Sequence, residues 1–261
     1  MTILDRILET KRQEVAFAKT KKTYEEILSE AQNIDRAMAS FSKAIAGSET
    51  GIIAEFKRKS PSKGFIKEGA KVTEIVRSYA DNGAAAISVL TDSDYFAGSL
   101  DDLRQARSVT TIPLLRKDFV IDPYQLCEAR IAGADAVLLI AAALSPKQCE
   151  DLAGLAVSLG LEVLLELHKQ TELTHISPFI SVIGINNRNL ATFETDINTS
   201  IQLSTSLPSS FIRISESGIS LPESVKQLQK NGFKGFLMGE NFMKQEDPGE
   251  ALRGFIKELK R

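Results

Sequence analysis

The sequence predicts an α/β fold in which repeated strand–helix units close into a (β/α)8 barrel, preceded by an N-terminal helical extension. From Gly51 onward, apolar runs of about five or six residues alternate with polar loops and amphipathic segments, as is typical of parallel strands covered by helices. Four helical segments end in glycine just before the next apolar run, at Gly83, Gly133, Gly160 and Gly232, and glycine commonly ends helices. The length of 261 residues is close to the about 250 residues of such a barrel, the TIM-barrel architecture.

The first part of the chain predicts helices. Apolar side chains recur among charged ones at near-helical spacing in residues 3–18, and residues 24–32 and 40–46 read as a second and a short third helix. Phe17, Met38 and Phe41 in this region are interpreted as packing residues and not as a cofactor site.

No linker rich in proline, glycine or serine follows these helices. We therefore expect a single domain over residues 1–261, with residues 1–48 as a helical extension. We expect the extension to cover the barrel mouth, because some element must keep water out of a site that is open at one end. The chain ends soon after its last helical segment, so one activity is expected.

The strands and helix starts can be assigned along the rest of the chain. Strands are expected near residues 52–56, 85–90, 112–116, 134–140, 161–166, 181–186, 211–215 and 234–238. A capped helix start is predicted where a cap residue stands three positions before Glu or Gln with proline between them. This pattern occurs at Asp122, Ser145, Ser220 and Asp247. An open, doubly wound sheet is the alternative, but it usually carries a G-x-G-x-x-G turn after its first strand, and EFKRKSPSKG has none.

Composition excludes several classes of protein. Lys+Arg number 32 and Asp+Glu 34, so neither nucleic acid nor an anionic membrane is favoured as a partner. The apolar run 136–144 is far shorter than the roughly 18 residues of a membrane span, and residues 1–15, with no apolar core and no cleavage site, are not expected to be a signal peptide. Cys127 and Cys149 have no metal-ligand or disulfide pattern, and His168 and His175 cannot alone make a zinc site. We expect no metal and a reducing, cytoplasmic setting.

Charged and small polar residues gather where the expected strands end, which is where barrels carry their chemistry. Glu55 and Lys57 lie two apart on one strand and so should point to the same side. A solvated, lysine-rich loop is the alternative for this stretch, and a structural ion pair for each residue alone. Convergence from several strands favours an active site at these residues: Glu55, Lys57, Ser60, Thr91, Asp92, Arg116, Lys117, Asp118, Phe119, Glu166, His168, Asn186, Arg188, Ser215, Glu216, Ser217, Gly218, Gly239, Glu240 and Asn241.

Two local environments refine this prediction. Glu166 closes the run LEVLLE, where burial against leucines suits a general base. The loops ISESGIS and LMGEN after the last two strands offer glycine and small polar residues, whose backbone N–H groups could face a phosphate. Ordinary turns are the alternative for each loop alone.

Seven motifs together carry a family resemblance. EFKRKSPSKG, SVLTDSDYFAGS, LLRKDFVIDPYQ, LLELH, GINNRNL, SESGI and LMGENFM, in this order, resemble the indole-3-glycerol-phosphate synthase family of tryptophan biosynthesis. The resemblance runs from the N-terminal helices to the last helix. It implies a carbon-carbon lyase that closes the indole ring of 1-(2-carboxyphenylamino)-1-deoxyribulose 5-phosphate with loss of carbon dioxide and water and needs no cofactor.

The resemblance also implies roles for individual residues. Lys117 would be the general acid and Glu166 the general base, with Glu55 and Lys57 as catalytic partners and Lys57 near the substrate carboxylate. Phe119 would lie against the aromatic ring, and Ser217, Gly218 and Gly239 would cradle the phosphate. An acid beside phosphate would repel it, so Glu240 would act through its backbone N–H. The implied substrate-binding set is Ser60, Phe119, Asn186, Arg188, Ser217, Gly218, Leu237, Gly239 and Glu240.

The state of Lys117 stays open at this point. Arg116 and Lys57 would lower the pKa of Lys117, whereas Glu55 and Asp118 would raise it, and the outcome depends on which side chains face inward. If the cations and apolar walls dominate, the pKa would fall toward roughly 7 to 8, which suits a general acid.

Other functions remain possible on the same fold. A sugar-phosphate isomerase with a carboxylate pair and an aldolase forming an imine on Lys117 or Lys57 are alternatives, as is a barrel that binds a phosphorylated ligand without turnover. Borohydride trapping would reveal an imine, and product fluorescence would reveal turnover. We expect a phosphorylated small-molecule substrate and a monomer or weak homo-oligomer.

Overall fold

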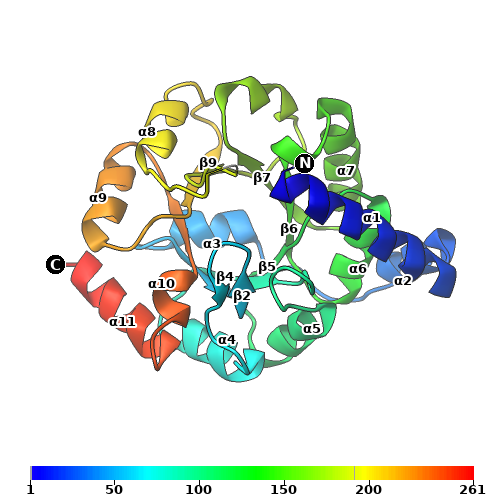
Figure 1. Ribbon diagram of the computed structural model, residues 1–261, viewed down its shortest axis with the longest axis horizontal. Coiled ribbons are helices and arrows are strands. Elements are labelled where there is room, and N and C mark those ends of the chain that lie inside the picture. Colours follow the sequence, from blue (N-terminus) through cyan, green and yellow to red (C-terminus); the bar gives the residue numbers. More distant parts are fainter. Residues whose placement is uncertain (1, 191) are drawn as a thin grey trace.

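The computed structural model describes residues 2–190 and 192–261, in which parallel strands close into a barrel (Figure 1). Around the barrel the order is β1-β10-β9-β8-β7-β6-β5-β4, each strand pairing in parallel with its neighbours. The strands are β1 (Ile52–Phe56), β4 (Ala86–Leu90), β5 (Leu114–Lys117), β6 (Ala136–Ile140), β7 (Glu162–Leu167), β8 (Val182–Asn186), β9 (Ile212–Glu216) and β10 (Gly235–Met238). Every predicted strand is confirmed within two residues at each end.

Helices surround the strands in Figure 1, and their buried faces pack on the barrel's outer surface. They are α4 (Val72–Asp81), α5 (Leu100–Val109), α6 (Pro123–Ile131), α7 (Pro146–Ser158), α8 (Asn198–Ser204), α9 (Pro222–Lys230), α10 (Glu240–Met243) and α11 (Pro248–Leu259), with short 3-10 helices η1 (Ala141–Ala143) and η2 (Gln170–His175). Capping by Asp122, Ser145 and Asp247 is confirmed. The prediction for Ser220 is wrong, because Pro222 is the first helical residue and Leu221 therefore holds the cap position.

The N-terminal helices are α1 (Ile3–Lys21), α2 (Tyr24–Gln32) and α3 (Phe41–Gly47), and they do not all lie at the mouth. Phe41 and Ile45 of α3 are buried inside the barrel among residues such as Ala86 and Ala136, near the start of their strands. Helix α1 instead contributes to the cavity at the opposite end, and in Figure 1 it lies in front of the strands while α3 lies behind them. The extension therefore reaches both ends of the barrel.

Ion pairs fasten this segment at the base of the barrel. The buried carboxylate of Asp135, just before β6, lies 2.7 Å from Arg36 Nη1 and 2.7 Å from Arg107 Nη1. It also accepts hydrogen bonds from the backbone N–H groups of Ala39 and Leu114. Because both oxygens of a fully buried carboxylate are satisfied by cations and N–H donors, this junction holds the connection between α2 and α3 in one place.

The predicted packing role is confirmed for Phe41 and Met38 and wrong for Phe17. Phe41 is fully buried and Met38 is packed against the main core, as predicted. The prediction for Phe17 is wrong: it is 64% exposed, with Lys21 Nζ 5.0 Å from the ring centroid. On α1, the buried face is formed by Ile7, Leu8, Lys11 and Val15, which leaves Phe17 on the solvent side.

A small hairpin follows β1 and was not expected from the sequence. It consists of β2 (Lys59–Ser60) and β3 (Gly64–Phe65), paired antiparallel, and Gly64 takes the positive φ that its turn requires. The hairpin brings Ser60 to the barrel mouth. Within the described ranges, no helix combines the length and apolar character needed to cross a membrane.

Candidate active site

One cavity at the C-terminal ends of the strands is lined by every catalytic and substrate-binding residue that the family resemblance implies, whereas six other strand-end candidates do not line it: Thr91, Asp92, Arg116, His168, Ser215 and Glu216. The implied residues that line it are Glu55, Lys57, Ser60, Lys117, Phe119, Glu166, Asn186, Arg188, Ser217, Gly218, Leu237, Gly239 and Glu240. Glu55, Lys117, Glu166 and Asn186 are carried inward by β1, β5, β7 and β8. The structure thus brings together side chains that lie far apart in the sequence.

Lys117 lies among carboxylates. Its Nζ is 2.5 Å from Oε2 of Glu216, and 3.8 Å from an Oε2 of both Glu55 and Glu166. Burial alone would lower the pKa of Lys117, but these carboxylates outweigh burial and the pKa is raised. The possibility of a pKa near 7 to 8 is therefore wrong, because the side chains that face Lys117 are mainly acidic.

The neighbours expected to tune Lys117 from its own strand point elsewhere. Arg116 donates to the carbonyl of Gln125 at 2.6 Å and pairs with Asp118 at 2.9 Å. The Asp118 carboxylate forms no ion pair with Lys117 among the described contacts. Alternation along β5 explains this, because consecutive side chains of a strand point to opposite sides.

Glu216 was among the strand-end candidates, but it was assigned no catalytic role from the sequence. It is fully buried, and burial raises the pKa of Glu216 to about 7, assisted by the nearby negative charges of Glu166 and Glu55 and opposed by Lys117. A signal was present: Ile214 faces the barrel interior, and the period of two puts Glu216 on the same side.

Glu55 and Lys57 do share a direction, as predicted. Lys57 Nζ is 2.6 Å from Glu55 Oε1. Burial would raise the pKa of Glu55, but Lys57 and Lys117 outweigh it and the pKa of Glu55 is lowered. Glu55 therefore stays ionised and links the two lysines.

Backbone groups dominate the end of the cavity formed after β9 and β10. Ser217 and Gly218 have successive positive φ values of 66° and 73°. Within the described chain, the N–H groups of Gly218 and Ile219 donate no hydrogen bond, so they are free for an anion. A Cβ on Gly239 would lie 2.5 Å from Glu55 Oε1, which means that only glycine fits there without displacing Glu55.

An apolar wall forms another part of the cavity. Phe119 and Phe96 have ring centroids 6.1 Å apart, and both line the cavity together with Ile3, Leu4 and Ile7 from α1. Phe96 belongs to one of the recognised motifs but was assigned no role. The wall suits an aromatic ring.

The polar lining of the cavity also includes Arg188 and Ser60, and His168 lies beside it. Arg188 Nη1 donates to Ser62 Oγ at 3.3 Å and to the carbonyl of Phe193 at 3.2 Å. Ser60 Oγ is buried with no hydrogen-bond partner in the described part of the chain, which leaves it available to a ligand. His168 Nε2 lies 3.4 Å from Glu166 Oε1, and burial lowers the pKa of His168.

The described residues contain no group of three or more His, Cys, Asp or Glu side chains arranged to hold a metal ion. What they do offer is a charged lysine held between carboxylates, a second lysine, an arginine, free N–H groups and an aromatic wall. This set can bind an anionic aromatic sugar phosphate and exchange protons with it.

Comparison with known proteins shows the family of the chain. The family model described as indole-3-glycerol phosphate synthase matches residues 4–255. Proteins named indole-3-glycerol phosphate synthase are similar over nearly full length: one from Bacteroides thetaiotaomicron is 53% identical, covering 98% of this chain and 98% of that protein, and one from Bordetella pertussis is 46% identical, covering 97% and 98%.

Solved structures support the fold. A mutant tryptophan synthase alpha-subunit from Pyrococcus furiosus superposes with a TM-score of 0.62 at 15% identity, covering 81% of this chain and 98% of that one. The corresponding subunit from Legionella pneumophila gives a TM-score of 0.62 at 13% identity, covering 85% and 97%.

Proposed function

Because the chain belongs to the indole-3-glycerol phosphate synthase family, we propose that the cavity at its barrel mouth is the active site and that the residues predicted from the sequence act there. The chain is a carboxy-lyase of tryptophan biosynthesis. It closes the indole ring of 1-(2-carboxyphenylamino)-1-deoxyribulose 5-phosphate and releases carbon dioxide and water, so its substrate is a phosphorylated small molecule.

Lys117 is the general acid in this proposal. When the aromatic ring carbon attacks the ketone, the ketone oxygen takes up a proton and later leaves as water, and a charged lysine at that oxygen supplies the proton. The observation that carries the assignment is the position of Lys117 Nζ, 2.5 Å from Glu216 and 3.8 Å from Glu55 and Glu166. The carboxylates hold the ammonium group in place and favour its charged form.

Glu166 is the general base, which removes a proton as water leaves. It reaches the same cavity from β7, with its Oε2 3.8 Å from Lys117 Nζ. Glu216 exchanges protons with Lys117, because Glu216 is the carboxylate closest to the Lys117 ammonium group. Lys57, held by Glu55 at 2.6 Å, receives the substrate carboxylate until it departs as carbon dioxide.

The remaining residues position the two ends of the substrate. Phosphate binds at the free N–H groups around Gly218 and beside Gly239, with Glu240 contributing its backbone and not its carboxylate. The aromatic ring lies against Phe119. Ser60, Asn186, Arg188, Ser217 and Leu237 complete the substrate-binding set.

Helix α1 alone is proposed to cover the mouth, because Ile3, Leu4 and Ile7 line the cavity whereas α3 is buried at the other end. The proposal keeps residues 1–261 as one domain. We further propose a monomer or weak homo-oligomer. Two buried, unpaired cysteines support a cytoplasmic location.

The test is turnover of the anilino substrate, followed by product fluorescence. Lys117→Met should lower kcat by about two to four orders of magnitude, the usual contribution of a general acid, with a much smaller change in KM. Lys147→Met, at an exposed ion pair with Asp151, is the matched control. Normal kcat in Lys117→Met would remove Lys117 as the acid, and a covalent adduct after borohydride treatment would favour an aldolase.

A further inference from the structure

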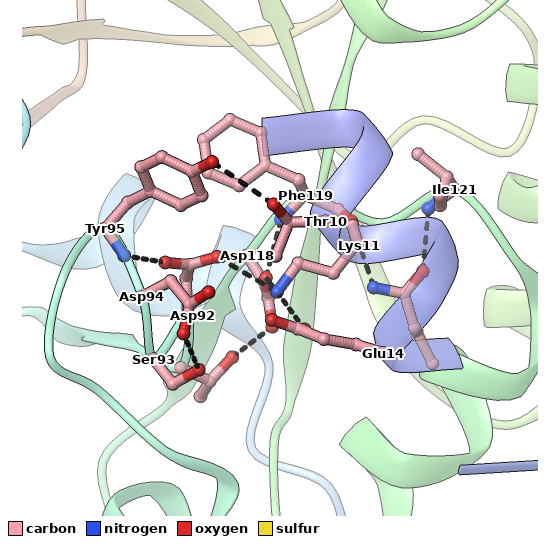
Figure 2. Close-up of polar contacts among 12 residues, drawn as sticks. Thr10, Lys11, Glu14, Asp92, Ser93, Asp94, Tyr95, Asp118, Phe119 and Ile121 are labelled. Atoms are coloured by element: carbon pink, nitrogen blue, oxygen red, sulfur yellow. Dashed lines mark hydrogen bonds and ion pairs between the residues drawn. The ribbon is translucent and has the colours of Figure 1, made fainter. Parts of the chain in front are cut away.

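Helix α1 buries a lysine at its contact with the barrel (Figure 2). Lys11 is only 2% exposed, and its Nζ lies 2.7 Å from Glu14, 3.0 Å from Asp92 and 3.0 Å from Asp118. Lysine is seldom buried so completely, and a buried ammonium group is costly unless its partners are held in place. The two aspartates come from different loops of the barrel, after β4 and within the turn that follows β5.

Each aspartate also fixes the backbone beside one ring of the apolar wall. Asp92 Oδ1 accepts a hydrogen bond from the N–H of Tyr95 at 2.8 Å, and Phe96 is the next residue. Asp118 Oδ1 accepts from the N–H of Phe119 at 2.8 Å. Lys11 therefore connects the two loops that bring Phe96 and Phe119 to a centroid distance of 6.1 Å in the active-site cavity.

The two aspartates depend on Lys11 to different degrees. Asp118 has further partners, Arg116 at 2.9 Å and Thr91 Oγ1 at 2.6 Å. Among the described residues, Lys11 is the only cation paired with Asp92. A second tie joins α1 to the loop after β4, where Thr10 Oγ1 lies 3.2 Å from the hydroxyl of Tyr95, as Figure 2 shows. Losing the charge of Lys11 should therefore loosen the Phe96 loop most.

We propose that Lys11 is a positioning residue that orders the Phe96–Phe119 wall when α1 is docked, so that docking of the N-terminal helix and binding of the substrate's aromatic ring are coupled. The inference rests on the proposed function of the cavity, in which this wall receives the ring. It makes α1 more than a cover: the helix determines where the aromatic wall stands.

The test compares Lys11→Met with Arg12→Met. The first variant keeps the length and apolar stem of the side chain but removes its charge, and the second removes an exposed charge that pairs only with Glu9 among the described residues. In Lys11→Met, KM for the anilino substrate should rise about tenfold or more, within the range of coupling between contacting groups. In the same variant, the dissociation constant of ribulose 5-phosphate, which has no aromatic ring, should stay within about twofold of the wild-type value. In Arg12→Met, both the KM for the anilino substrate and the dissociation constant of ribulose 5-phosphate should stay within about twofold of wild type.

Amide hydrogen exchange supplies an independent readout. The N–H groups of Tyr95 and Phe119, which donate to the two aspartates, should exchange faster in Lys11→Met. Asp92→Asn, which keeps the shape of the acceptor, gives a second variant should Lys11→Met fold poorly, and it should show the same selective rise in KM.

The outcomes separate this inference from the proposed function. An unchanged KM in Lys11→Met or in a folded Asp92→Asn, or an equal weakening of ribulose 5-phosphate and the anilino substrate, would overturn the positioning role. Absence of turnover in the wild-type protein would instead overturn the proposed function.

Discussion

Replacing Glu216 with glutamine should make the stability of the protein, relative to wild type, increase as pH rises. Burial raises the pKa of Glu216 from 4.5 to about 7. Below about pH 4.5 the carboxyl is protonated in both folded and unfolded chains, so its ionisation costs nothing. As pH rises toward 7, the unfolded chain releases this proton while the folded chain retains it, and the folded state is progressively destabilised.

The size of this effect follows from the two pKa values. At about 1.4 kcal/mol for each pKa unit, a rise from 4.5 to about 7 corresponds to about 3 kcal/mol of lost stability above pH 7. Glutamine has nearly the same shape but does not ionise. Whatever the variant's stability relative to wild type at pH 4.5, its advantage should grow by about 3 kcal/mol by pH 8.

Thermal unfolding at several pH values measures this difference directly. For a chain of this size, 1 kcal/mol shifts Tm by about 2–4 °C, so the gap between Glu216→Gln and wild type should widen by roughly 6 to 12 °C between pH 4.5 and pH 8. Glu68→Gln, at an exposed position, is the control and should show a constant gap. A constant gap for Glu216→Gln as well would refute the reasoning, since it would mean that Glu216 ionises normally in the folded protein.

Four further predictions concern other parts of the site and the fold. Because acidic neighbours raise the pKa of Lys117, kcat/KM should show no loss from Lys117 deprotonation up to about pH 10. If kcat/KM fell below pH 10 and this fall disappeared in Lys117→Arg, the prediction would be contradicted. Gly239→Val should raise KM strongly, because its Cβ would displace Glu55 and close the phosphate end; wild-type affinity for substrate would argue against a phosphate there. Deleting residues 2–22 should leave a folded barrel by circular dichroism with kcat/KM lowered about tenfold or more, and full activity would rule out a covering role. Asp135→Asn should lower stability by about 1–3 kcal/mol, since it removes the buried charge that two part-buried arginines share, yet leave KM unchanged; denaturant titration and steady-state kinetics together would detect any other result.

Strand positions and the membership of the cavity could be predicted because both depend on local patterns. Apolar runs ending in glycine-capped helices define the strands, and the carboxyl ends of parallel strands must meet at one end of a barrel. Glu55 and Lys57 could be paired from their spacing alone, as their 2.6 Å contact shows.

The protonation of Lys117 could not be predicted in the same way. It depends on contacts across the barrel, between β5 and side chains from β1, β7 and β9, and no sequence spacing encodes those distances. Likewise Phe17 and Phe41 look alike in the sequence, but only Phe41 enters the barrel. The side on which each helix docks is decided by tertiary packing and not by its own periodicity.

The N-terminal segment is synthesised before the residues that it contacts in the folded protein. Residues 2–47 leave the ribosome before the barrel strands, yet Lys11 needs Asp92 and Asp118, Arg36 needs Asp135, and α3 enters a ring of strands that is closed by β10. Contacts so distant in sequence form slowly. The N-terminal segment must therefore wait, with the apolar side chains of α3 uncovered, until almost the whole chain has emerged, and during this interval the growing chain is most exposed to aggregation.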